Sequence, residues 1–264
     1  MSFVVVNADD FGLTAGVAQG IILCSESGIL LSTSAMTCVE GSQAILERDA
    51  RQFAGGIGLH LQLTQGTPIC PAGEVPSLVT ANGHFPDRRP AVSVQAADIA
   101  REWRAQMNRL RELGIVPDHL DTHHNVHARP LGDGKILREY AALAAEFNLP
   151  ARSGPRCVAG ALRDNGVACP DVLISFSEAQ GDLDALVAAL DTEREAAGDD
   201  LLVEICCHPG LYDLALEART LPRYGRLREK ELAAFVRGEF VKRLQEEGWT
   251  IIEYRDVKRL RGQL

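Results

Sequence analysis

Acids and histidines follow apolar, strand-like segments at four places in this 264-residue chain. The segments are 7–12 (NADDFG), 58–60 (GLH), 119–127 (HLDTHHNVH) and 204–210 (EICCHPG). The carboxyl ends of parallel strands meet on one face of a barrel, so residues about 50 to 85 positions apart can converge there. The spacing therefore predicts one reaction centre assembled from four strand ends.

These residue types suit metal-assisted hydrolysis. One carboxylate and two histidines from separate strands bind a divalent cation and leave positions open for water and substrate. The metal lowers the pKa of its water and polarises a carbonyl oxygen. A second carboxylate can then remove a proton from the water, while a histidine protonates the departing amine. The residues that can supply this set are Asp9, Asp10, His60, His123 and His208.

Simpler interpretations exist for some of these residues. The Asp9-Asp10 pair also suits a turn or a helix cap, and His60 alone also suits a buried, hydrogen-bonded histidine. In an extended strand the two carboxylates would face opposite ways, so a shared site requires a bend at the strand end, which Gly12 permits. Four histidines and an aspartate within residues 119–127 are hard to explain as packing, and they favour a metal or catalytic role.

Further polar residues lie beside these segments. Asp121 precedes His123 by two positions on the same strand face, and can fix a histidine tautomer or be a ligand itself. Glu204 is interpreted as a residue that orients a ligand, or as a buried, hydrogen-bonded acid. Arg152, near a predicted strand end, can hold an oxyanion or a sugar hydroxyl, although a surface arginine is the commoner case. We expect no direct metal contact from the remaining histidines, His84, His119 and His124.

Apolar, β-branched runs alternate with stretches of helical period, which indicates repeated βα units around a parallel sheet. Strands are predicted at 3–8, 32–37, 57–63, directly after 117–121, 149–152, 201–206 and 250–253. Helices are predicted at 15–26, 42–48, 94–113, 137–147, 183–196 and 227–246. Residues 65–90, rich in Gly and Pro, are predicted to form a long loop, and 153–175 show no clear pattern. The prediction is an α/β fold, a closed or partly closed barrel of about seven βα units, in one domain spanning 1–264.

Composition excludes several other classes. The formal net charge of −9 disfavours nucleic acid as a partner. No apolar run approaches the roughly 18 residues of a membrane span, and residues 1–10 lack the basic start of a secretory signal, so we expect a cytoplasmic protein that does not enter the membrane. The seven cysteines show no metal or redox spacing and are expected to be reduced.

Four motifs in chain order carry a family resemblance: NADDFG at 7–12, GLHL at 58–61, HLDTHH at 119–124 and CHPG at 207–210. Together they resemble the YdjC/ChbG-like carbohydrate deacetylases, over a region from Val5 to about Glu231. The resemblance implies a distorted, TIM-like (β/α) barrel related to polysaccharide deacetylases and often dimeric, hence a homodimer. It also implies removal of the N-acetyl group, with release of acetate, from an amino sugar or a short chitooligosaccharide.

The same resemblance assigns roles to individual residues. It implies that Asp10, His60 and His123 hold Mg²⁺ or Zn²⁺, that Asp9 is the general base, and that His208 is the acid that protonates the leaving amine. These assignments agree with the chemistry expected from the residue types alone. The expected partner is a small N-acetylated sugar, and the low content of Trp and Tyr favours a short one.

One position departs from the family pattern. Many relatives have histidine where this chain has Asn125, so a contact to substrate or to a ligand is expected to differ, because asparagine binds metal poorly. His127 lies four residues after His123 and would share its face if the segment were helical. We therefore treat His127 as a competing ligand and prefer His123.

Other functions remain open from the sequence. One is a different metal hydrolase, such as a phosphoesterase or a cyclic amidase, although Arg152 is the only arginine that the sequence places near the motifs. Another is a non-catalytic carbohydrate-binding protein, for which Asn125 is the only hint. Two histidines and a carboxylate also suit Fe(II) oxygenases, but that chemistry would not need Asp9 and His208.

Overall fold

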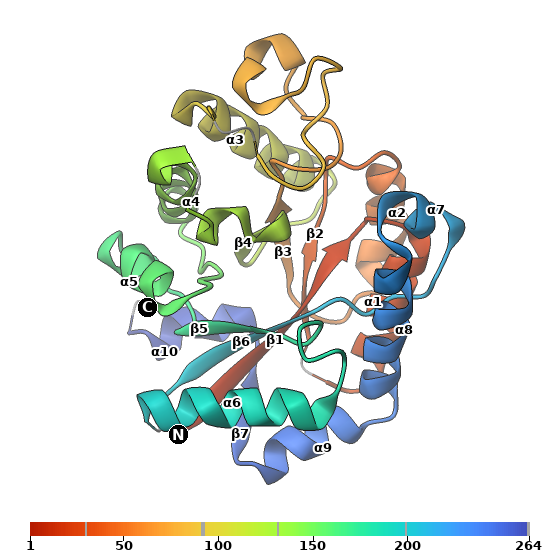
Figure 1. Ribbon diagram of the computed structural model, residues 1–264, viewed down its shortest axis with the longest axis vertical. Coiled ribbons are helices and arrows are strands. Elements are labelled where there is room, and N and C mark those ends of the chain that lie inside the picture. The colour runs from red at the N-terminus through yellow and green to blue at the C-terminus, as the bar shows by residue number, and fades with distance from the viewer. Residues whose placement is uncertain (30, 91–92, 131, 199, 263–264) are drawn as a thin grey trace.

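A parallel sheet of seven strands forms the centre of this computed structural model, which describes residues 1–29, 31–90, 93–130, 132–198 and 200–262 (Figure 1). The strand order is β4-β3-β2-β1-β6-β5, and β7 also pairs with β1. The strands are β1 (Ser2–Phe11), β2 (Ser32–Ala35), β3 (Ile57–Leu61), β4 (Leu120–Thr122), β5 (Val172–Ser175), β6 (Leu202–Cys207) and β7 (Trp249–Ile252).

Strand β1 is the central strand. Nine of its ten residues are buried, as expected for a parallel strand covered on both faces. One edge pairs with β6, while the other pairs with β7 along its first half and with β2 along its second half. Two strands, β7 and β2, therefore share one edge of β1.

The curled sheet is only partly closed. Between β4 and β5, Ala151 forms a single parallel bridge with Leu120, and the Leu173 amide donates to the Gly154 carbonyl at 3.1 Å. The strand predicted at 149–152 is therefore reduced to this one bridge. The distorted (β/α) barrel predicted from the sequence is confirmed.

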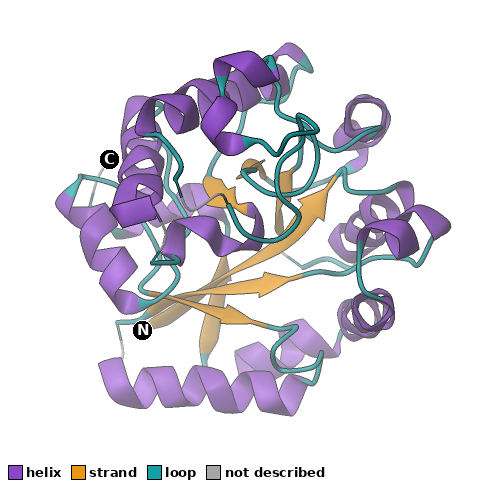
Figure 2. Ribbon diagram, turned by 45° about the horizontal axis from the view of Figure 1, so that its top comes forward, coloured by secondary structure: helices purple, strands orange, loops and turns teal. Residues whose placement is uncertain are grey.

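Helices lie around the outside of the sheet (Figure 2). In α3 the buried side chains of Ile99, Trp103, Met107 and Leu110 recur every three to four residues and form one apolar face. The helices are α1 (Ala15–Glu26), α2 (Ser42–Asp49), α3 (Ala96–Glu112), α4 (Lys135–Glu146), α5 (Arg156–Asp164), α6 (Leu183–Ala197), α7 (Leu214–Arg219), α8 (Pro222–Val236), α9 (Glu239–Glu246) and α10 (Val257–Leu260). No helix in the described ranges is long and apolar enough to cross a membrane.

Two regions differ from the prediction. The single helix predicted at 227–246 is wrong: the chain forms α8 and α9, separated at Gly238, whose φ of 73° is left-handed and ends a helix. The region 153–175, which shows no clear pattern in sequence, contains α5 and β5.

The loop at 65–90 is held against the barrel. It contains two short 3₁₀ turns, Ala72–Glu74 and Pro76–Leu78. The buried Glu102 of α3 accepts hydrogen bonds from the amides of Ile69 and Cys70, each at 2.9 Å. This anchor fixes the start of the loop next to the carboxyl ends of the strands.

Candidate metal and catalytic site

The two adjacent aspartates at the end of β1 reach the same site because the strand bends. Asp10 has a left-handed φ of 74°, and the pairing register with β2 shifts between Ala8 and Phe11. The bend predicted from the sequence is present, but it begins at Asp10 itself and continues through Gly12, where φ is 101°. A left-handed aspartate is uncommon, and here it turns a second carboxylate towards the strand ends.

Asp10, His60 and His123 bring three ligand atoms together. Asp10 Oδ1 lies 3.4 Å from His60 Nε2 and 3.2 Å from His123 Nδ1, and the two nitrogens are 3.2 Å apart. Ligand atoms about 2.0 to 2.2 Å from one cation are separated by about this much in tetrahedral or octahedral geometry. The three residues form a group that could hold a metal ion.

The hydrogen bonds of both histidines orient their lone pairs towards this point. His60 Nδ1 donates to Asp121 Oδ1 at 2.7 Å, which leaves Nε2 to face Asp10. His123 Nε2 donates to Gln65 Oε1 at 2.9 Å, and Gln65 is itself oriented by donating its amide to the Arg219 carbonyl at 2.9 Å. Such partners fix the tautomer of a metal-binding histidine.

Asp10 Oδ1 fits a cation ligand by a further observation. This buried atom has no hydrogen-bond partner among the described residues, although buried carboxylate oxygens are normally satisfied. A bound divalent cation would satisfy it. Burial opposes ionisation of Asp10, but the Arg228 guanidinium, bonded to Oδ2, holds the pKa of Asp10 well below its ordinary value.

Asp121 stabilises the charged form of His60. Burial lowers the pKa of His60, but Asp121, together with Asp10, outweighs this effect and raises it to about 10. Asp121 is held in turn by the Ser34 hydroxyl, which donates to Oδ2 at 2.7 Å. A metal ion at this site would therefore have to displace a proton from His60.

Arg152 holds Asp9 in place. Its Nη1 and Nη2 donate to the two oxygens of Asp9 at 2.7 and 2.6 Å, and its Nε and Nη2 donate to Glu204 Oε1 at 2.8 and 2.7 Å. Nη1 also donates to Asn125 Oδ1 at 3.4 Å, and Nη2 lies 3.2 Å from Asp121 Oδ2. Every N–H group thus has an acceptor within the protein. The side chain is fully buried, so the oxyanion contact considered from the sequence has no free donor to make it.

This network also determines the charges of the two acids. Burial opposes ionisation of Asp9, but the Arg152 guanidinium outweighs it and holds the pKa of Asp9 well below its ordinary value. For Glu204 burial prevails over Arg152 and raises the pKa. Glu204 Oε2 accepts a hydrogen bond from the Tyr254 hydroxyl at 2.5 Å. The orienting role expected for Glu204 is therefore exerted on Arg152 and not on a histidine.

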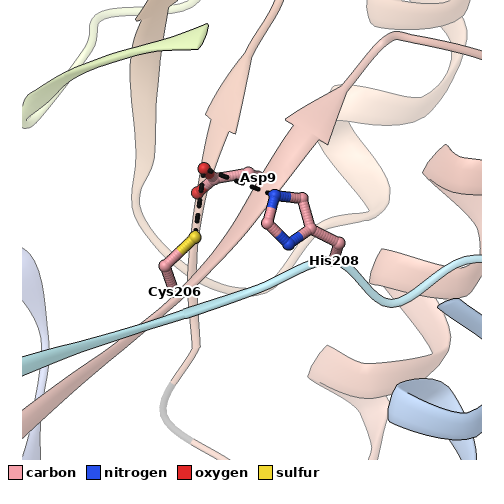
Figure 3. A group of neighbouring side chains, drawn as sticks. All are labelled: Asp9, Cys206 and His208. Carbon is pink, nitrogen blue, oxygen red and sulfur yellow. Dashed lines mark hydrogen bonds and ion pairs between the residues drawn. The ribbon is translucent and has the colours of Figure 1, made fainter. Parts of the chain in front are cut away.

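His208 follows β6 and faces Asp9, with its Nε2 3.9 Å from Asp9 Oδ2 (Figure 3). Its other nitrogen, Nδ1, lies 2.9 Å from the Ser177 hydroxyl, which donates to Glu231 Oε1 at 2.5 Å. Glu231 Oε2 also accepts the His208 backbone N–H at 2.5 Å. Ser177 therefore accepts from His208 Nδ1–H, which leaves Nε2 as the nitrogen that faces the site.

The remaining predicted residues lie around this centre. The segment from His123 to Ala128 is a distorted 3₁₀ turn, in which His124 and Asn125 are left-handed, with φ of 57° and 49°. His127 is consequently turned away: its Nδ1 lies 2.6 Å from Thr122 Oγ1 and its Nε2 2.7 Å from the Ser153 carbonyl. Both nitrogens are engaged, so this arrangement supports the preference for His123 as a ligand.

Sequence reasoning missed several residues of the site. They are Gln65, Ser177, Arg228, Glu231 and Tyr254. Gln65, Ser177 and Tyr254 follow β3, β5 and β7, but they lie outside the four motifs, and Arg228 and Glu231 belong to α8. Their position after a strand was the one available signal, and it was not used because these residues are neither aspartate nor histidine. The sequence placed only Arg152 near the motifs, and this was incomplete, because the buried Arg228 of α8 also contacts Asp10.

Fold and site together define a parallel (β/α)-barrel protein with buried carboxylates and histidines at the carboxyl ends of its strands. The YdjC-like protein family matches residues 3–246. A carbohydrate deacetylase from Geobacillus stearothermophilus is 33% identical, over 98% of this chain and 99% of the relative. A carbohydrate deacetylase from Enterococcus faecalis is 31% identical, over 96% of this chain and 97% of the relative.

A solved structure shares the fold of this chain. The crystal structure of a protein from Enterococcus faecalis V583 superposes with a TM-score of 0.83 at 30% identity, covering 97% of this chain and 99% of that one. The chain belongs to the YdjC-like family, as its four sequence motifs predicted.

Proposed function

We propose that this protein is a metal-dependent carbohydrate N-deacetylase, which hydrolyses the acetamide of an amino sugar or a short chitooligosaccharide and releases acetate. The observation that carries the proposal is the convergence of Asp10 Oδ1, His60 Nε2 and His123 Nδ1 beside a second carboxylate and a partly exposed histidine. Relatives named carbohydrate deacetylases support the substrate class.

Asp10, His60 and His123 would hold the cation, and their oxygen and nitrogen donors suit Mg²⁺ or Zn²⁺. The cation, when bound, supplies Lewis-acid polarisation of the amide carbonyl and a lower pKa for water. Asp121 and Gln65 keep the two histidines in the tautomers that this role requires.

Asp9 and His208 would carry the proton transfers. Arg152 keeps Asp9 ionised, so Asp9 can accept a proton from the attacking water. His208, entering this step with a proton on each ring nitrogen, donates the Nε2 proton to the amine nitrogen as the C–N bond breaks, giving acetate and the free amino sugar. Ser177 holds Nδ1 of His208, so that the transferable proton is the one on Nε2. The homodimer, the single domain and the cytoplasmic location expected from the sequence stay predictions.

The direct test is acetate release from a panel of N-acetylated mono- and oligosaccharides, with the protein loaded with Mg²⁺ or Zn²⁺. Because general base catalysis contributes about 10² to 10⁴ in rate, Asp9→Asn should lower kcat by that factor and leave metal binding intact. Asp10→Asn should abolish metal binding measured by calorimetry. Asp164→Asn, at an exposed position on α5, is the matched control and should behave as wild type.

Other outcomes decide among the alternatives. Sugar binding without acetate release would identify a binding protein. Hydrolysis of a phosphate ester or a cyclic amide instead would identify a different metal hydrolase, and the second buried arginine, Arg228, makes phosphate a necessary member of the panel. Full activity of Asp9→Asn would refute the proposed mechanism.

A further inference from the structure

A cysteine lies next to the proposed catalytic pair. Cys206 of β6 directs its thiol to Asp9, and its Sγ donates to Asp9 Oδ2 at 3.3 Å (Figure 3). His208 lies two residues further along the chain and faces the same carboxylate, so all three side chains meet at the end of β1 (Figure 3). One ligand atom from each residue lies within 4.8 Å of the others.

This cluster differs from the Asp10 cluster in all three of its residues, and only Asp9, Cys206 and His208 include a sulfur. The two clusters are neighbours, since a third group, Asp9, His60 and Asp121, contains one residue of each. Cys206 and Asp9 are buried, whereas the side chain of His208 is 29% exposed. His208 is therefore the member of the group that solvent reaches.

We propose that Asp9, Cys206 and His208 form a second metal site, which takes a thiophilic divalent cation such as Zn²⁺ or Cd²⁺. The consequence for activity rests on the function proposed above: a cation bound here inhibits hydrolysis, because it occupies the general base and the general acid together. The chemistry of binding is an exchange of a proton for the cation: the Cys206 S–H bond breaks, a sulfur–metal bond forms, and the proton leaves to solvent.

The distances suit this exchange. With bonds of about 2.3 Å to sulfur and about 2.0 Å to oxygen or nitrogen, tetrahedral Zn²⁺ separates sulfur from oxygen by about 3.5 Å and oxygen from nitrogen by about 3.3 Å. The observed separations are 3.3 Å between Cys206 Sγ and Asp9 Oδ2, and 3.9 Å between Asp9 Oδ2 and His208 Nε2. A movement of about half an ångström by the partly exposed His208 ring brings its nitrogen to the required separation from Asp9. Cys206 and His208 offer ligand atoms within 4.8 Å of each other, so the same ring movement has to bring these two closer as well.

Ligand type separates the two sites. Oxygen and nitrogen donors at Asp10, His60 and His123 accept Mg²⁺, whereas a thiolate selects Zn²⁺ or Cd²⁺ over Mg²⁺. The Arg152 guanidinium already binds both oxygens of Asp9, so it opposes a second cation at this carboxylate. The second site is therefore weaker than the first and fills after it.

The test is a Cd²⁺ titration of the protein carrying one equivalent of Zn²⁺, which fills the stronger first site alone. Binding is monitored through the ultraviolet Cd–thiolate charge-transfer band. The matched variants are Cys206→Ser and Cys207→Ser. Cys207 is the next residue of β6, is fully buried, and directs its thiol to the Asn7 carbonyl at 3.2 Å, so it should not bind this metal.

We expect the band in wild type and in Cys207→Ser with dissociation constants within twofold of each other. In Cys206→Ser the band should be lost, or the dissociation constant raised at least tenfold. A band of equal strength in Cys206→Ser would assign it to another cysteine and overturn the proposal, as would the absence of a band in wild type.

Inhibition is measured separately, as acetate release relative to the uninhibited rate of each protein. Excess Zn²⁺ should inhibit wild type and Cys207→Ser, Cys206→Ser should need at least tenfold more Zn²⁺, and excess Mg²⁺ should not inhibit. If the protein releases no acetate from any sugar, the deacetylase proposal fails, while the Cd²⁺ titration still decides the metal site. Inhibition unchanged in Cys206→Ser would overturn the inhibitory role.

Discussion

Among the buried charged residues of the site, Arg152 is the one whose removal we expect to lower the free energy of unfolding most. Its guanidinium is the cation that contacts Asp9 and Glu204 directly, and it also lies 3.2 Å from Asp121. Arg152→Met keeps much of the aliphatic stem but removes the charge and all five N–H donors. The three acids would then be buried without this partner.

The expected loss follows from two opposing terms. Charge centres about 4 Å apart attract by about 4 kcal/mol at an effective dielectric constant of 20, and Arg152 has such a contact with each of two carboxylates at least. The cost of burying the guanidinium, several kcal/mol, offsets part of this attraction in the wild type. Removing one partner of a buried pair therefore costs about 3 to 5 kcal/mol of the free energy of unfolding.

Urea unfolding of the metal-free protein, followed by circular dichroism, measures this loss. The matched control is Arg104→Met, because Arg104 forms an exposed ion pair with Glu146, at side-chain exposures of 46% and 41%. Exposed pairs contribute about 0 to 1 kcal/mol, so the control should lose no more than that. Adding Glu204→Gln to Arg152→Met should recover part of the loss, since one buried charge is removed.

A loss below about 1 kcal/mol for Arg152→Met, equal to that of Arg104→Met, would refute the reasoning. It would mean that the three acids become protonated at little cost when the guanidinium is absent. The pH dependence distinguishes the two cases. In wild type the depressed pKa of Asp9 gives stability that is lost as pH falls through acid values, and Arg152→Met should lack this contribution.

Three further predictions follow from the site. Burial lowers the pKa of His127 to about 4, so the unfolded chain binds its proton first, and stability should fall by about 3 kcal/mol as pH falls from 6.5 to 4. Buried His123 and His124, whose pKa values are also lowered, contribute to the loss in every variant, so the prediction concerns the difference: urea unfolding across this range should show about 3 kcal/mol less loss in His127→Gln than in wild type or in the exposed control His84→Gln. Equal slopes in all three would contradict it. Ser177→Ala should lower kcat about tenfold with KM within twofold, because a neutral hydrogen bond that orients His208 is lost, and Ser177→Thr should restore kcat in steady-state assays. An unchanged kcat in Ser177→Ala would count against the contact. Mg²⁺ or Zn²⁺ at 100 times its Kd should raise the free energy of unfolding by about 2.7 kcal/mol in wild type and not in His60→Gln; an equal rise in both would place the ion elsewhere.

The strand-end motifs could be recognised from the sequence because they combine two local signals, the periodicity of a strand and the residue types at its end. Apolar runs and helical periodicity located β1, β3 and β6, and the acids and histidines stand in the last residues of these strands or directly after them. Parallel connectivity then implied that they meet, since every such strand ends at the same edge. The bend at Asp10 was also foreseeable, because two adjacent carboxylates cannot otherwise share a site.

Helix breaks and irregular segments were harder to predict from the sequence. Residues 227–246 have continuous helical character apart from Gly238, and a lone glycine is tolerated in many helices, so the break between α8 and α9 was not evident. The segment 149–152 has the composition of a strand but makes only one bridge. Pairing partners, and not composition, decide whether such a segment becomes a strand.

The sequence by itself determined the family, the barrel class and the residues that meet at the strand ends, because each depends on short motifs and local periodicity. Only the tertiary structure decided how those residues are held. Arg152 lies 143 positions from Asp9, Arg228 lies 218 positions from Asp10, and Ser177 lies 31 positions from His208. A hydrogen bond across such separations depends on how the helices pack on the sheet, and no local pattern in the chain encodes it.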